Sequence, residues 1–155
     1  MALSHGGALH FRAIPAESAG LSTREDAMNP ETVKTTVTNL IAAIQAKDQK
    51  AWLACFADDA VSHNPVGTPP IRGLDGLSQV FEKLVSVVKD IRFTAESMFV
   101  AGNEVAVKYT INGQGKGGRL VAIEGINVYE VNDRGKIQTV RAYWNPAELV
   151  AQLKK

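Results

Sequence analysis

The hydrophobic pattern of the chain changes its period near Ile91, and this change limits the folds that the sequence can adopt. Before Ile91, apolar residues recur at the three- and four-residue spacing of amphipathic helices. After Ile91, apolar and polar residues alternate in segments separated by turn residues, as strands do. Helices followed by strands are typical of an α+β domain whose helices cover one face of a sheet.

Three helices are expected in the first half of the chain. Asn29-Pro30-Glu31 combines a capping side chain, a proline at the first helical position and an acid in the first turn. The helix that starts there should end near Lys47. Asp48 can cap a second helix that continues through Phe56, and a third helix opens at Gly73.

A rigid corner is expected after the second helix. Asp58-Asp59 should end that helix, and residues 60–64 read as a short strand before the turn Pro65-Val66-Gly67. The polar pair His63-Asn64 therefore lies where a strand meets a turn, which is a good place to fix a side chain in a pocket. Alternation puts Asn64 on the same face as Ser62 and turns His63 to the other face.

The second half predicts an antiparallel meander and a closing helix. Strands are expected over residues 91–100, 104–111, 119–131 and 136–144. Asn145-Pro146 can cap a short final helix. A strongly curved antiparallel sheet with three N-terminal helices on its concave face forms a cone, and a cone encloses a pocket.

Composition excludes several classes of function. The formal net charge of +1 over 155 residues gives no reason to expect nucleic acid or a membrane as partner. The single cysteine, Cys55, cannot form an internal disulfide and favours a reducing, cytoplasmic location. Three scattered histidines lack the spacing of metal ligands, and GQGKGG reads as a hairpin loop and not as a phosphate cradle. We therefore expect no metal and no cofactor.

The chain is expected to hold one domain. Residues 1–28 are rich in glycine and serine, and they lack the basic start and apolar stretch of a secretory signal. We interpret them as an N-terminal arm or leader. Residues 29–155 contain no internal repeat and no second boundary, so they should form a single α+β domain.

Several motifs of this domain resemble a known family. The run AIQAKDQKAWLACFADDAVSHNPVGTPPIRGLDGL, followed by GKIQTVRAYWN, resembles the ketosteroid isomerase branch of the nuclear transport factor two-like superfamily, which also includes polyketide cyclases. The most specific marks are ADDAV, PVG, the IRG before a helix, and RAYWN. The resemblance implies a cone-shaped, cystatin-like α+β barrel. The fold alone does not fix a reaction, because many chemistries share it.

The resemblance also implies roles for particular positions. The isomerases use an aspartate base immediately before Pro-Val-Gly, and Asn64 stands there, whose neutral amide cannot act as that base. The aspartic acid of their oxyanion hole corresponds to Asn127, which can still donate a hydrogen bond to an enolate oxygen. The tyrosine of that hole corresponds to Leu40, which cannot donate. Trp144 matches an aromatic position that lines the family's pocket.

Asn64 and Asn127 are thus the candidate catalytic residues. The candidate substrate-binding residues are Leu40, Phe56, Ser62, Tyr129 and Trp144. Tyr129 shares the face of Asn127, so its hydroxyl could replace the missing donor. Glu124 should point away from the pocket and pair with a basic side chain on the outer face of the sheet. The Asp-Arg-Asp set of the related epoxide hydrolases is missing, so we reject that reaction.

Two functions remain open. One is an isomerase-like enzyme with an atypical site, which moves a proton on an apolar carbonyl compound. The other is a non-catalytic binder of a small hydrophobic ligand, steroid-like or polyketide-like. The preserved turn and Trp144 favour the first function, and the loss of the aspartate at Asn64 favours the second. Alternation also leaves apolar side chains on the outer face of the sheet, which predicts a homodimer.

Overall fold

The structure is a computed structural model that describes residues 29–155, so the expected arm at residues 1–28 lies outside the described part. The helices are α2 (Pro30–Gln45), α3 (Gln49–Leu53), α4 (Gly73–Val87) and α5 (Pro146–Lys154), and a short 3-10 turn, η1, covers Lys116–Gly118. The strands are β1 (Phe56–His63), β2 (Ile71–Arg72), β3 (Lys89–Ala101), β4 (Glu104–Gln114), β5 (Leu120–Val131) and β6 (Ile137–Tyr143). Helices α2 to α4 all precede the long strands β3 to β6, and this segregation confirms the α+β prediction.

Helix α2 begins as its sequence predicts. The Oδ1 atom of Asn29 accepts a hydrogen bond from the backbone N–H of Glu31 at 2.9 Å, and Pro30 occupies the first turn. The apolar face of the helix is fully buried, with Val33 and Val37 at 0% exposure. Burial of this face anchors α2 on the sheet, and its C-terminal half carries Leu40 toward the interior.

The second helix is shorter than predicted. Helix α3 ends at Leu53, and β1 begins at Phe56, so Asp58 and Asp59 lie within a strand and do not end a helix. Strand pairing decides this boundary: the backbone N–H of Ile137 donates to the carbonyl oxygen of Cys55 at 2.8 Å, and Phe56 pairs with Ile137. This partner lies some eighty residues downstream, and the local spacing of apolar residues carries no signal of it.

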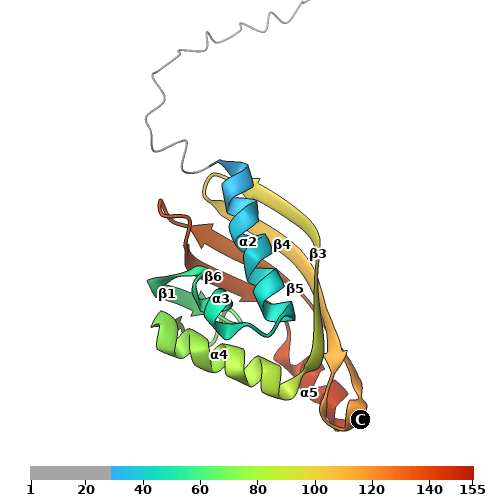
Figure 1. Cartoon of the computed structure of the whole chain (residues 1–155). Coiled ribbons are helices and arrows are strands. Elements are labelled where there is room, and N and C mark those ends of the chain that lie inside the picture. The colour runs from blue at the N-terminus through green and yellow to red at the C-terminus, as the bar shows by residue number, and fades with distance from the viewer. Residues whose placement is uncertain (1–28) are drawn as a thin grey trace, which may run out of the picture.

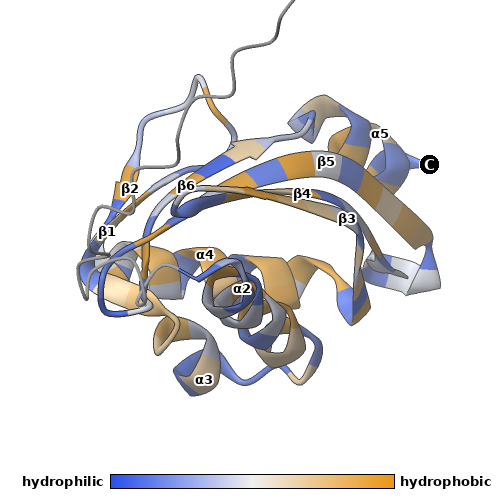
Figure 2. Cartoon of the chain, turned by 90° about the horizontal axis from the view of Figure 1, so that it is seen from above, coloured by the Kyte–Doolittle hydropathy of each residue, from blue (hydrophilic) through white to orange (hydrophobic). Residues whose placement is uncertain are grey.

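The sheet is mixed and strongly curved. Its order is β2-β1-β6-β5-β4-β3, with antiparallel neighbours except for β1 and β6, which run parallel. The prediction of a wholly antiparallel sheet is therefore wrong for the pair β1 and β6. The two-residue strand β2 was not predicted. Figure 2 shows the sheet arching over α2, α3 and α4, which lie on its concave side. The predicted cone is therefore present, with helices on the expected face.

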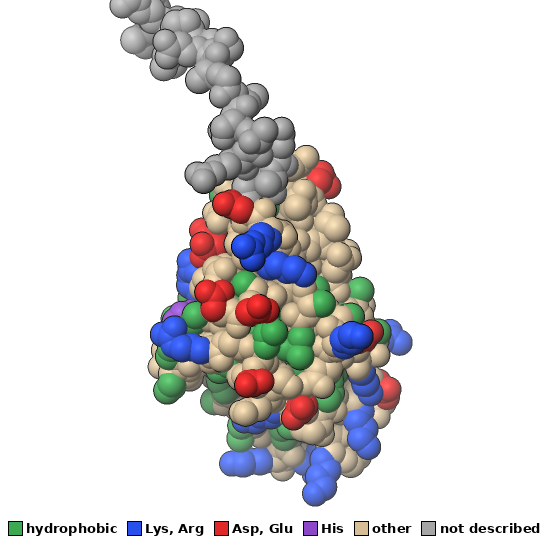
Figure 3. All heavy atoms as spheres, turned by 60° about the vertical axis from the view of Figure 1, so that its left-hand side comes forward, with side chains coloured by type: hydrophobic (Ala, Val, Ile, Leu, Met, Phe, Trp, Pro, Cys, Tyr) green, Lys and Arg blue, Asp and Glu red, His purple; other side chains and the backbone are tan. Residues whose placement is uncertain are grey.

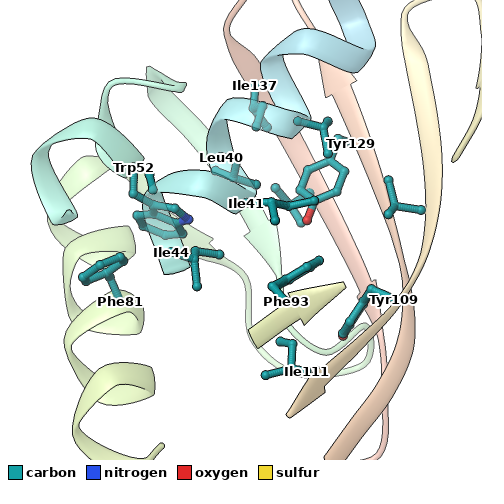
Figure 4. Close-up of a cluster of buried hydrophobic side chains, with 14 of the residues drawn as sticks. Leu40, Ile41, Ile44, Trp52, Phe81, Phe93, Tyr109, Ile111, Tyr129 and Ile137 are labelled. Carbon is teal, nitrogen blue, oxygen red and sulfur yellow. The ribbon is translucent and has the colours of Figure 1, made fainter. Parts of the chain in front are cut away.

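Helix α4 and the sheet enclose the core between them (Figure 1). Leu77 and Phe81 of α4 are buried, and Trp52 packs between Phe81 and Phe56 with ring centroids 5.3 and 4.7 Å apart. Figure 4 shows Trp52 and Phe81 on the helical side and Phe93 and Tyr109 on the strand side of the cluster. Phe93 stacks on Tyr109 at 4.9 Å.

Helix α5 closes one end of the sheet. The side chain of Gln152 makes two hydrogen bonds to the backbone of Ala122, donating at 2.9 Å and accepting at 2.7 Å. Arg119 donates to the carbonyl oxygen of Leu153 at 3.0 Å. These contacts hold α5 beside β5, so that Leu149 can reach the interior.

Two further features concern the surface charge and the length of the helices. Figure 3 shows acidic and basic side chains intermixed on the face that it displays. Within residues 29–155, no helix combines the length and apolar composition that crossing a bilayer requires.

Candidate functional site

A cavity of about 320 Å³ lies between the concave face of the sheet and the helices. This volume is at the lower end of the range of small-molecule sites. Most of its wall is aliphatic or aromatic, from α2, α4 and the inward-facing positions of the strands. The polar groups on the wall are few, and they belong to Trp52, Ser62, Asn64, Lys83, Tyr109, Asn127, Tyr129 and Trp144. Such a wall suits a largely apolar molecule with a few oxygen atoms.

All seven residues chosen from the sequence line this cavity. They are Leu40, Phe56, Ser62, Asn64, Asn127, Tyr129 and Trp144. They come from α2, from β1 and the corner after it, from β5, and from the end of β6. The structure therefore brings together all of the positions that the sequence singled out, whereas their chemical roles stay predictions.

Asn64 and Trp144 form one polar pair on the wall. Both follow the ends of neighbouring parallel strands, since His63 of β1 pairs with Arg141 of β6. The indole Nε1–H of Trp144 donates to Oδ1 of Asn64 at 2.7 Å. The backbone N–H of Val66 donates to the carbonyl oxygen of Ala142 at 2.9 Å and ties the corner to β6. Because the Asn64 oxygen is engaged, its NH₂ group remains available to a guest.

Asn127 and Tyr129 form a second polar pair, on β5. They share the inward face because they are two residues apart in a strand. The Nδ2 atom of Asn127 donates to the hydroxyl oxygen of Tyr129 at 2.9 Å. The Oδ1 atom of Asn127 is buried and has no hydrogen-bond partner among the described residues. Figure 4 shows the Tyr129 hydroxyl directed inward, toward the region between Ile41 and Phe93.

Burial keeps both inward-facing phenols in the neutral form. It raises the pKa of Tyr129 to about 12, although the hydrogen bond from Asn127 acts in the opposite direction. Burial also raises the pKa of Tyr109, and the neighbouring Tyr129 adds to this rise. At neutral pH both hydroxyls are therefore hydrogen-bond donors toward a guest and cannot serve as bases.

These raised pKa values predict a loss of stability in alkali. Above about pH 10 the unfolded chain releases phenolic protons that the folded protein keeps, so the free energy of unfolding falls as pH rises toward 12. The expected slope is about 1.4 kcal/mol per pH unit for each retained proton. Urea unfolding between pH 9 and 11.5 measures it. Tyr129→Phe removes one of these protons, so the free energy of unfolding should fall less steeply with pH, by about 1.4 kcal/mol per pH unit. An unchanged slope in that variant would contradict the raised pKa of Tyr129.

Three further polar residues of the wall, Trp52, Lys83 and Tyr109, were not chosen from the sequence. The inward position of Tyr109 follows from its alternation with the buried Val107 and Ile111 along β4. Trp52 is 7% exposed and lines the cavity, and its indole nitrogen is buried without a hydrogen-bond partner among the described residues. No sequence signal distinguishes such an indole from a fully satisfied one.

Several polar residues lie away from the cavity. His63 and Glu124 are absent from its wall, as their parity predicted. The ion pairs of the described residues are Lys108–Glu96 at 3.1 Å and Arg141–Glu104 at 2.9 Å, so within residues 29–155 Glu124 does not make the predicted pair. Glu124 lies opposite Thr110 in the sheet, which offers no cation.

The functional groups of the wall are amides, hydroxyls and indoles, with one ammonium group at Lys83. None of the described residues that line the cavity carries a carboxylate or an imidazole. Among residues 29–155, no three His, Cys, Asp or Glu side chains gather in the manner of a metal site. The wall can therefore orient oxygen atoms through amide, phenol and indole groups, while Lys83 stands at its exposed rim on α4.

Comparisons with known proteins agree with this architecture. The model of the SnoaL-like domain family matches residues 37–140. A steroid Delta-isomerase of Nocardioides simplex is 26% identical over 118 residues, which cover 76% of this chain and 94% of the isomerase.

Solved structures resemble the chain over a similar extent. RV0760c from Mycobacterium tuberculosis, in complex with estradiol-17beta-hemisuccinate, is 25% identical with a TM-score of 0.68, over 76% of this chain and 96% of that one. A computationally designed 17-OHP binder is 26% identical with the same TM-score, over 76% and 95%. The epoxide hydrolase/cyclase-like enzyme SalBIII, at 19% identity and a TM-score of 0.71 over 77% and 95%, shares the fold.

Proposed function

Because the chain belongs to the family of SnoaL-like domains, within the nuclear transport factor two-like superfamily, we propose that its cavity binds a small, largely apolar molecule that carries hydroxyl or carbonyl oxygen. The observation that carries this proposal is the wall itself: a cavity of about 320 Å³, mostly apolar, with two preformed polar pairs and no carboxylate or imidazole among its described residues. A flat, rigid guest such as a steroid or a cyclic polyketide has this chemistry.

Each wall residue has a proposed part in binding. Asn64 donates its NH₂ group to a guest oxygen while Trp144 holds the amide in place. Asn127 and Tyr129 offer further hydrogen bonds to oxygen at the same, sheet-side wall. Leu40, Phe56 and the small Ser62 form the surface on which the apolar body of the guest rests. The similarity to RV0760c, solved in complex with estradiol-17beta-hemisuccinate, and to the designed 17-OHP binder supports a steroid as the first ligand to test.

Thermal unfolding with added ligand tests the binding proposal. A ligand that binds the folded state alone raises its free energy of unfolding by about 2.7 kcal/mol at one hundred times Kd. We expect estradiol to raise Tm in a dose-dependent manner, and the same concentrations of cholic acid, which is larger and more polar, to have less effect. The absence of any shift with a panel of steroids and phenols would refute the proposal for this ligand class.

Isomerisation is a second candidate, favoured by the similarity to the steroid Delta-isomerase of Nocardioides simplex. That reaction needs a group that removes a proton next to a carbonyl. The amide of Asn64 cannot hold that proton, and the phenols on the wall are held neutral by burial. We therefore place binding before isomerisation, and a substitution at Asn64, described in the Discussion, separates the two.

We also propose that two copies associate through the convex face of the sheet. Phe99 is 71% exposed on this face, and the neighbouring pair Ile126 and Tyr143 is 46% and 48% exposed. Side chains of this kind gather at protein interfaces. Helices cover the opposite face, so the convex face is the one that remains available.

The dimer proposal predicts that one substitution on this face converts the dimer into a monomer. Light scattering at micromolar concentration should give twice the mass of one chain for the wild type. Ile126→Glu places a charge in the middle of the face and should yield the single-chain mass with unchanged circular dichroism. Glu124→Gln, a neighbouring change that adds no charge, is the control and should leave the dimer intact. A wild type that scatters as a monomer would contradict the proposal.

A reducing compartment such as the cytoplasm fits the one cysteine. The thiol of Cys55 is half-buried, and burial raises its pKa, which outweighs the opposite effect of the nearby Lys136. A thiol of this kind is mostly protonated at neutral pH and should react slowly with alkylating reagents. We propose a structural role for it and a cytoplasmic location for the protein.

A further inference from the structure

The indole nitrogen of Trp52 is a buried donor without an acceptor. Trp52 is 7% exposed, its Nε1 atom has no hydrogen-bond partner among the described residues, and the side chain lines the cavity. Leaving a buried donor unpaired costs free energy that a partner would recover. An indole N–H can only donate, so the missing partner must be an acceptor.

Packing prevents Trp52 from resolving this deficit by itself. Its ring lies edge-on to Phe56, with an interplanar angle of 61°, and tilted against Phe81 at 46°. Figure 4 shows the nitrogen on the side of the ring that faces away from Phe81, toward Leu40 and Ile44. Both aliphatic residues line the cavity and offer no acceptor. The N–H is therefore directed toward two side chains of the cavity wall, and among the described residues it meets no acceptor there.

The other unpaired atom of the cavity behaves differently. Asn127 Oδ1 lacks a partner, but its amide can rotate by half a turn, so that Tyr129 donates to the oxygen and the NH₂ group becomes free. The sheet-side pair can thus accommodate either a hydroxyl or a carbonyl group of a guest. Trp52 has no such alternative, which makes it the more selective of the two positions.

Resting on the proposed binding function, we propose that Trp52 Nε1 is a specificity-determining donor for a second oxygen of the ligand. The preferred guest is a rigid apolar compound with oxygen at two separate places: one, a hydroxyl or carbonyl, at Asn127 and Tyr129, and one acceptor at Trp52. The two contacts lie on different walls, since Trp52 belongs to α3 and Asn127 to β5. Compounds with oxygen at one place alone leave one of the two walls unsatisfied.

A cycle of ligands and variants tests this inference. The probes are estrone, 3-deoxyestrone and 17-deoxyestrone, and the readout is Kd from titration calorimetry with the whole chain. Trp52→Phe keeps an aromatic ring against Phe56 and Phe81 but removes the N–H. One of the two deoxy compounds lacks the oxygen that Trp52 contacts, and for that compound Trp52→Phe should change Kd little. For estrone, which carries that oxygen, the same variant should raise Kd by about tenfold more.

A control and a second measurement separate specificity from damage to the fold. Leu53→Ala loosens the same helix at a residue outside the cavity wall, and it should weaken all three probes by one common factor. In the wild type, the ¹⁵N-labelled Trp52 indole N–H signal should move downfield with estrone and not with the deoxy compound that lacks its acceptor. Because this second measurement uses only the wild-type protein, it does not depend on whether a variant folds.

The outcomes are distinct. If Trp52→Phe weakens all three probes equally, or if the indole signal responds alike to all three, Trp52 is packing and the inference is overturned while ligand binding stands. If none of the probes binds the wild type, the proposed function fails for steroids and this inference fails with it.

Discussion

Asn64→Asp is expected to turn a binding cavity into a proton-transferring one. The new carboxylate would stand where Trp144 already donates to Oδ1 of Asn64 at 2.7 Å, and it would face the same cavity. A positioned general base contributes about 10²- to 10⁴-fold to rate. We expect a Δ5-3-ketosteroid to be isomerised by this variant at a rate at least a hundredfold above that of the wild type, measured by the ultraviolet absorbance of the conjugated product.

His63→Asp is the matched control for this substitution. It adds the same charge one residue earlier, but His63 does not line the cavity, so its activity should stay at the level of the wild type. Wild-type turnover as high as that of Asn64→Asp would refute the view that the base has been lost. A variant that binds the steroid without turnover would show that the guest does not present its acidic carbon to residue 64.

Gly125→Ala should cost about 1–3 kcal/mol of stability, because a methyl group at this position has no room. Its Cβ would lie 2.6 Å from the carbonyl oxygen of Tyr143 and 2.7 Å from the hydroxyl of Tyr109. The first contact is with backbone, so β5 and β6 must separate. Urea denaturation measures the change, and a loss below about 0.5 kcal/mol would mean that the sheet yields more easily than its packing suggests.

Two comparisons locate the cause of that loss. Gly135→Ala, at a position with φ of 72° and open space around it, isolates backbone strain from steric overlap. Adding Tyr109→Phe to Gly125→Ala removes the contact with the hydroxyl but keeps the Tyr109 ring carbon, 3.0 Å from the new Cβ, and should restore part of the stability. If the double variant recovers nothing, the hydroxyl contributes nothing to the loss, and the contacts with the Tyr143 backbone and the Tyr109 ring account for it.

Much of the fold follows from local signals in the sequence. Asn29 and Asn145 each accept a bond from the backbone N–H two residues later, as their Asn-Pro pairs predicted. The change from helical to alternating spacing near Ile91 marks the start of β3 to within two residues. The parity of Asn127 and Tyr129 placed both on the inward face of β5. These features depend only on neighbours within a few residues.

Other features depend on distant partners and could not be predicted in this way. The end of α3 and the start of β1 are set by Ile137, whose backbone N–H reaches Cys55 from the other end of the domain. Trp52 and Phe56 have helical spacing, yet they contact each other from a helix and a strand. Whether a buried polar atom finds a hydrogen-bond partner likewise depends on three-dimensional packing. The sequence therefore could not predict that Trp52 Nε1 lacks a partner among the described residues.

The two tryptophans of the chain both line this cavity, Trp52 from α3 and Trp144 from the end of β6. No third indole elsewhere contributes background light, so the intrinsic emission of the protein originates at this chamber. Whatever enters must change the polarity or quenching around at least one of the two fluorophores. The chain thus carries its own optical reporter, and a library of compounds can be screened against it without a label.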